Sequence, residues 1–94
     1  MRFEWDPNRA ASNIAKHEVS FSLAEEVWDD PLHVVIAERV VDGEPRRQAF
    51  GVVDGMALLV VVHSYRDVNN EEVIRIFGAR RVTKHERRTY EEDA

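Results

Sequence analysis

The chain has 94 residues, which is the length of one small domain, and we expect residues 1–94 to form a single unit. It contains no cysteine, which excludes disulfides and thiolate chemistry and fits a reducing cytoplasm. No apolar run approaches the ~18 residues that a membrane-spanning helix needs, so we expect a cytoplasmic protein without a membrane partner. The formal net charge of −5 argues against a polyanion bound over the whole surface.

The charges are distributed unevenly along the sequence. Residues 18–44 carry eight acidic side chains against one arginine, whereas residues 75–88 carry six basic side chains against one glutamate. Such asymmetry predicts one anion-binding face and one acidic face for a different, basic partner. Ordinary solubilising charge is the alternative interpretation.

The N-terminal part of the chain predicts one strand and two helices. Phe3 and Trp5 alternate with Arg2 and Glu4, which is the pattern of a short strand. Asp6 is a suitable N-cap for a helix that runs to about His17, with proline at its first position. Ser20 caps a second helix, and Pro31 cannot continue it. The sheet and its connections come after these helices.

Four further strands are predicted from β-branched residues separated by turn formers, at 32–41, 46–53, 57–66 and 72–81. Thr83 and Glu86 form a capping box for a C-terminal helix. The resulting order is β-α-α-β-β-β-β-α. Because consecutive strands joined by short turns pair antiparallel, we predict an α+β fold with a small antiparallel sheet and its helices gathered on one side.

The last predicted strand carries three arginines, and strand alternation places Arg75 and Arg81 on one face and Arg80 on the other. Arg75 and Arg81 lie about 20 Å apart at ~3.3 Å per residue, so they cannot grip one phosphate together. The two arginines suit contacts with well-separated phosphates of one nucleic-acid strand. The alternative is that one of the two arginines is structural. Arg80 lies near a helix N-cap, where backbone N–H groups also favour an anion, and a salt bridge to an acidic residue is the alternative.

Four segments have the order and spacing of motifs found in a known family. These segments are residues 3–7, 16–21, 29–31 and 74–87. Together they resemble the BrnT family, the toxins of type II toxin–antitoxin pairs. The resemblance implies a RelE-like fold and a ribonuclease that inhibits translation without a metal or other cofactor. It also implies a BrnA-type antitoxin that binds DNA, and a toxin–antitoxin heterotetramer. The family usually has glycine where this chain has Glu18, and a small polar residue where it has Gly78.

RNA cleavage without a metal requires a proton carrier and stabilisation of the charge on pentavalent phosphorus. His17 and His63 are the candidate proton carriers, because the ordinary pKa of histidine, about 6.5, suits both roles. A contact with the helix dipole is the alternative for His17, and a hydrogen-bonded core position is the alternative for His63. Arg80 and Arg81 are the candidates for phosphate stabilisation, because the arginine fork donates to two oxygens at once.

Other basic side chains are predicted to contact the RNA backbone, namely Lys16, Arg75, Lys84 and Arg87. The resemblance adds Arg46, which matches an arginine common in the BrnT family at this place. For Lys84 and Arg87, plain solvation is equally consistent with the sequence. The four histidines lack the spacing of a zinc site, and no cysteine flanks them, so we expect no metal. The alternative function is a non-catalytic protein-binding module in a DNA-bound complex, which the net acidity favours. DNA contact is expected only through the antitoxin.

Overall fold

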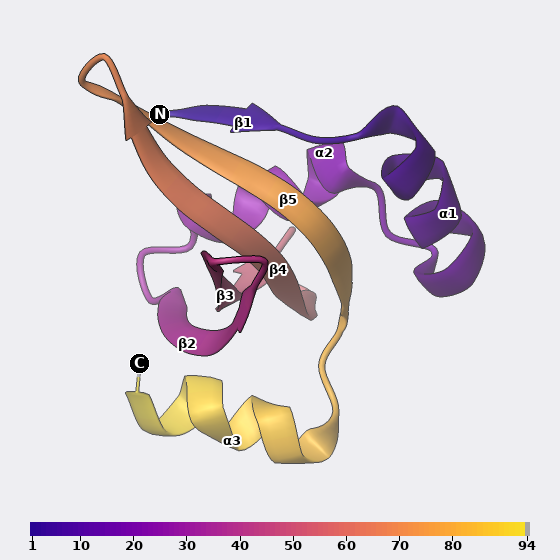
Figure 1. Ribbon diagram of the computed structural model, residues 1–94. Coiled ribbons are helices and arrows are strands. Elements are labelled where there is room, and N and C mark those ends of the chain that lie inside the picture. The colour runs from indigo at the N-terminus through magenta and orange to yellow at the C-terminus, as the bar shows by residue number, and fades with distance from the viewer. Residues whose placement is uncertain (94) are drawn as a thin grey trace.

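The computed structural model describes residues 1–93, which fold into a five-stranded sheet with helices around it (Figure 1). The helices are α1 (Pro7–His17), α2 (Phe21–Ala24), the 3₁₀ helix η1 (Glu25–Asp29) and α3 (Lys84–Asp93). The strands are β1 (Arg2–Glu4), β2 (Val34–Val41), β3 (Glu44–Val53), β4 (Ala57–Val68) and β5 (Glu71–Arg81). None of the helices in this part of the chain is long and apolar enough to cross a bilayer.

The strands are arranged in the order β1-β5-β4-β3-β2. Strands β2 to β5 pair antiparallel with their neighbours in sequence, as predicted for strands joined by short turns. Strand β1, however, pairs parallel with β5, so the sheet is mixed and the prediction of a purely antiparallel sheet is wrong at this edge. The reason is that the helices between β1 and β2 carry the chain away from the sheet, and β1 is free to pair with the last strand instead of the next one.

The second predicted helix is divided into α2 and the tighter η1, so the observed order contains an additional helical segment. Ser20 caps α2 as predicted, with its hydroxyl accepting a hydrogen bond from the N–H of Leu23 at 3.0 Å. Helix η1 lies directly on β3 at Gly51, where an added Cβ would be 2.9 Å from both Cγ1 and the carbonyl oxygen of Val27. Only glycine permits this close approach of the two backbones.

The main core lies between one face of the sheet and α2 with η1. Ala24 and Val27 are fully buried there against Leu59, Val61 and Ile76 of the sheet. Helix α3 instead contacts Arg80, whose neighbour Ala79 belongs to this core, so α3 meets the opposite face of the strand. The helices are therefore not all gathered on one side, contrary to the expectation.

A β-bulge in β5 decides which face each arginine occupies. Val62 pairs with Gly78 while His63 pairs with Ile76, which leaves Phe77 without a partner on β4. The extra residue reverses the alternation beyond Phe77. Arg75 and Arg80 consequently share a face, and Arg81 lies on the other, which corrects the predicted pairing of Arg75 with Arg81.

Candidate nucleic-acid interface

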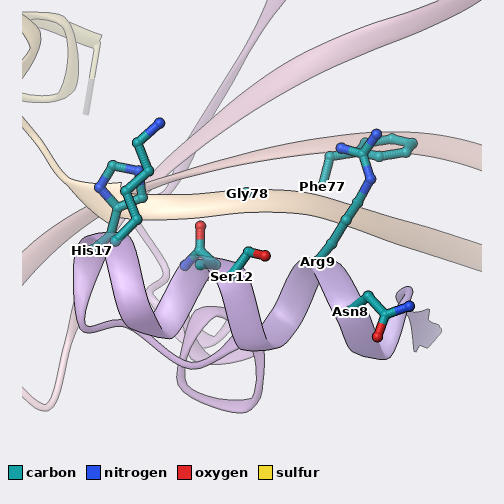
Figure 2. A pocket seen from close by; sticks show the side chains of 8 residues that line it. Asn8, Arg9, Ser12, His17, Phe77 and Gly78 are labelled. Carbon is teal, nitrogen blue, oxygen red and sulfur yellow. The ribbon is translucent and has the colours of Figure 1, made fainter.

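Helix α1 and strand β5 enclose a cleft of about 400 Å³. Its lining residues are Asn8, Arg9, Ser12, Asn13, Lys16, His17, Phe77 and Gly78. In Figure 2, the side chains of Ser12 and His17 rise from α1 toward the strand that carries Gly78, and Arg9 extends to the ring of Phe77. The cleft is thus rich in cationic and hydrogen-bonding groups, which suits an anionic, strand-like ligand.

The position of α1 depends on its two ends and on one buried amide. Asp6 caps the helix by accepting a hydrogen bond from the N–H of Asn8 at 2.8 Å, as predicted, and Pro7 follows it. Asn13 is 8% exposed, and its side chain pairs with both backbone groups of Ala79 on β5, at 2.8 and 3.1 Å. The same amide donates to the carbonyl of Val19 at 2.8 Å. These bonds fix the helix, and therefore the cleft, against the strand.

One end of the cleft is an arginine cluster around the ring of Phe77. The guanidinium carbon of Arg46 lies 3.9 Å from the ring centroid, that of Arg9 lies 5.5 Å away, and that of Arg75 lies 5.9 Å away. These distances are within the range of cation–π contacts. The arginines come from β3, α1 and β5, so the fold brings together positively charged groups that are remote in sequence.

A family model described as "Ribonuclease toxin, BrnT, of type II toxin-antitoxin system" matches residues 5–86. This chain belongs to the BrnT family. The crystal structure of the Brucella abortus ribonuclease toxin BrnT is similar to it, with a TM-score of 0.63 and 22% sequence identity over 89% of this chain and 99% of that one. No curated protein matches the chain significantly. As a member of this family, the present chain is a ribonuclease toxin of a type II toxin–antitoxin system, which implies an antitoxin partner.

Four of the predicted site residues of this BrnT chain meet at one surface. Lys16 and His17 line the cleft, and Arg46 and Arg75 join it through Phe77. Their roles in catalysis and RNA binding stay predictions. The geometry supports them, because a proton carrier and several phosphate ligands along one cleft are the parts that metal-free RNA cleavage needs.

Arg80, predicted to stabilise the reacting phosphate, forms a bidentate ion pair in the BrnT chain instead. Its Nη1 and Nη2 donate to the two carboxylate oxygens of Glu86 on α3, at 2.7 and 2.8 Å. The hydrogen bonds from Arg80 hold the pKa of Glu86 down to about 2, and those to Glu86 raise the pKa of Arg80. Glu86 also accepts from the N–H of Thr83, which completes the predicted capping box. Arg80 therefore links β5 to α3, and this geometry favours the salt-bridge alternative.

The remaining basic candidates lie near α3 and away from the cleft. Arg81 and Arg87 line a separate small pocket with Met56 and Leu58, and Lys84 is exposed at the first position of α3. Arg87 forms an exposed ion pair with Glu91 at 3.8 Å, which contributes little to stability. The structure does not bring these three residues to His17.

His63 lies on the other face of the sheet, inside the core. It is 2% exposed, its ring meets Trp28 edge-on at 4.9 Å, and its Nδ1–H donates to the carbonyl of Val61 at 3.1 Å. Burial lowers the pKa of His63, and the nearby charge of Arg47 lowers it further. The ring is a neutral core histidine at neutral pH. Its environment favours the structural alternative over proton transfer at the cleft.

The sequence interpretation missed several residues of the cleft. Arg9 and Ser12 were not candidates, yet both line the cleft beside Lys16. The signal that identifies them is helical spacing, because residues three and four apart share a helix face and the interval from Arg9 to Lys16 is two such steps. Phe77 carried no polar group and gave no such signal. Within the described part of the chain, no three His, Asp or Glu side chains group as metal ligands do.

Proposed function

We propose that this chain is a metal-independent endoribonuclease, whose RNA strand lies along the cleft between α1 and β5. The observation that carries the proposal is the grouping of Lys16 and His17 with an arginine cluster along a single concave surface. A single-stranded RNA has both features that such a surface binds, since it has regularly spaced phosphates and bases that stack on planar side chains.

The proposed reaction is attack of a ribose 2′-oxygen on the adjacent phosphorus. The 2′-hydroxyl loses its proton, the bond from phosphorus to the 5′-oxygen breaks, and the departing oxygen gains a proton. The products are a 2′,3′-cyclic phosphate and a free 5′-hydroxyl. His17 is the proton carrier, because it is the histidine among the side chains that line the cleft. Lys16 beside it stabilises the negative charge that develops on the phosphoryl oxygens.

In the toxin–antitoxin pair, we propose that the partner is a BrnA-type antitoxin, and that the two chains form a cytoplasmic heterotetramer which contacts DNA only through the antitoxin. The distribution of charge supports two docking chemistries, one on the basic side chains of the cleft, and one on the acidic residues 18–44. RNA cleavage would inhibit translation by removing messages. We also propose that the fold is RelE-like.

The second candidate function is a non-catalytic module that only docks the antitoxin. It is favoured by Glu18, whose carboxylate adds negative charge directly after His17, and by the net charge of −5. In that case the cleft would bind a partner or nothing, and RNA would stay intact.

The experiment is incubation of the purified protein with RNA in EDTA, beside two variants, His17→Ala and His85→Ala. His85 is an exposed histidine of α3 outside the cleft, so its variant is a matched control for the loss of one imidazole. We expect fragments with cyclic phosphate ends from the wild type and the His85 variant, and few from the His17 variant. Intact RNA at a large excess of wild-type protein contradicts the enzyme and supports the docking module.

A further inference from the structure

The arginine cluster around Phe77 concentrates positive charge with little internal compensation. Three guanidinium groups lie within 5.9 Å of one ring centroid. Among the described side chains, neither Arg9 nor Arg46 forms an ion pair. The buried Nε of Arg46 has no hydrogen-bond partner there either. A buried N–H of a charged group is normally satisfied, so this donor leaves hydrogen-bonding capacity within the cluster that the described side chains do not use.

The carboxylate closest to the cluster is already occupied. Glu4 Oε1 lies 3.6 Å from Nη1 of Arg75, but the same oxygen accepts a closer hydrogen bond from Arg66. One carboxylate thus faces two arginines, and Arg9 and Arg46 add further positive charge. The face of an aromatic ring attracts each cation, but it carries no net charge and cannot cancel their mutual repulsion. The cluster therefore keeps positive charge that the described side chains do not neutralise.

We propose that Arg9, Arg46 and Arg75 form one anion site that takes a phosphodiester phosphate of the RNA strand, with Phe77 as the positioning residue. The identity of the ligand rests on the proposed function, whereas the anion site itself does not. Phe77 is unpaired at the β-bulge, and bulges re-aim side chains beside functional sites. Alternation along β5 places the ring on the face that carries Arg75, and guanidinium groups from three elements gather on it.

This site binds a phosphate other than the reacting one. Arg9 and His17 lie near opposite ends of the cleft (Figure 2), and eight residues of α-helix extend about 12 Å at ~1.5 Å per residue. A phosphate held at Phe77 is therefore beyond the reach of His17. Its binding energy positions the strand, so we expect loss of the site to raise KM more than it lowers kcat.

The anion site can be tested without RNA, by calorimetric titration with inorganic pyrophosphate. We compare the wild type with Arg9→Gln, Arg46→Gln and the matched control Arg88→Gln, which removes the same charge from an exposed position on α3. We expect one bound pyrophosphate and affinity weakened about tenfold or more in the first two variants, with the control within about twofold. Equal affinities in all four proteins overturn the proposal.

The role of Phe77 is tested by two substitutions that differ in the ring. Phe77→Tyr keeps the aromatic face and should retain pyrophosphate affinity, whereas Phe77→Leu should weaken it about threefold or more, with an unchanged melting temperature. If the leucine variant does not fold, Arg46→Lys decides, because lysine keeps the charge but loses the planar stack and the fork. Wild-type affinity in Phe77→Leu, or in Arg46→Lys where that variant decides, contradicts the positioning role.

RNA is then distinguished from an acidic protein segment as the ligand. A single-stranded oligonucleotide with 2′-deoxy sugars can bind without being cut, because it lacks the attacking hydroxyl. The logarithm of its binding constant should fall linearly with the logarithm of the salt concentration, and the magnitude of this slope should be smaller by about 0.7 in Arg46→Gln. Tighter and Arg46-dependent binding of a polyglutamate peptide instead assigns the site to a protein. Pyrophosphate binding with uncut RNA refutes the proposed function alone. Cut RNA with equal pyrophosphate affinities in all variants refutes the anion site alone.

Discussion

The two halves of β5 both carry arginines, but they use them differently. In the first half, Arg75 lies with Arg9 and Arg46 around Phe77, where the ion pairs among the described residues include one carboxylate, that of Glu4, which Arg75 shares with Arg66. In the second half, Arg80 gives both Nη atoms to Glu86. The difference teaches that the number of arginines in a segment overstates its available positive charge. A neutralised arginine holds the fold together, and an arginine without a carboxylate is available to a ligand.

The largest expected effect is on catalysis at the cleft. His17→Ala should lower kcat for RNA cleavage by about 10²-fold or more, because it removes the proton carrier, and the pH–rate profile should lose one limb. The measurement is single-turnover cleavage from pH 5 to 9. A loss of similar size in His85→Ala would indicate that the reaction takes place near α3, and would contradict the assignment of catalysis to the cleft.

The next effect is on stability at the other half of the strand. Arg80→Ala should lower the free energy of unfolding by about 1–2 kcal/mol, because it leaves Glu86 half-buried without its bidentate partner. Cleavage per folded molecule should change by less than about threefold, since Arg80 does not line the cleft. Urea unfolding and cleavage assays check both numbers. Wild-type stability with a 100-fold loss of cleavage would instead support the phosphate-stabilising role first predicted for Arg80.

The Arg80–Glu86 pair also predicts a pH dependence. The hydrogen bonds from Arg80 lower the pKa of Glu86 from its ordinary value of 4.5 to about 2 in the folded protein, so the pair stabilises the fold fully above pH ~4.5 and less as the pH falls toward 2. Glu86→Gln should cost about 1 kcal/mol at pH 7, and this difference from the wild type should shrink between pH 4.5 and 2.5. Glu91→Gln, which alters an exposed pair, is the control. A pH-independent difference would assign the effect to the cap hydrogen bonds alone.

The smallest expected effect is that of a substitution at the C-terminal end of α1, next to His17. Glu18 has φ 59 and ψ 29, a left-handed conformation that glycine adopts more readily, and its N–H donates to Ile14 at 2.9 Å. Glu18→Gly should raise the free energy of unfolding by about 0.5 kcal/mol, because relief of strain exceeds the added chain entropy. It should also speed cleavage slightly by removing negative charge beside His17. Thermal unfolding measures the first effect, and a lower melting temperature would contradict it.

The sequence predicted much of the fold because its signals are local. The caps at Asp6, Ser20 and Thr83 and the strands joined by short turns depend on neighbouring residues alone. The parallel pairing of β1 with β5 depends on contacts across the whole chain, and no local pattern encodes it. The close packing of η1 on β3 depends on Gly51, which lies over 20 residues away in a different strand.

The candidate site was predictable only in part, for a related reason. Lys16 and His17 were found because they share a segment that resembles a known family, and both do line the cleft. The bulge at Phe77 was not foreseen, and it reversed the faces assigned to the arginines beyond it. Whether Arg80 is neutralised also depends on tertiary geometry, because it requires α3 to fold back so that Glu86 reaches the strand.

The amide of Asn13 has a consequence for self-association. Strand β1 covers only Val73, Ile74 and Arg75 of β5, which would leave the rest of that strand as an open template for another chain. The Asn13 side chain imitates a neighbouring strand at Ala79 by bonding both its N–H and its carbonyl. This blocks strand addition from a second molecule on that border of the sheet. Intermolecular β-pairing, and the aggregation that can follow from it, is thereby directed to β2 at the opposite border.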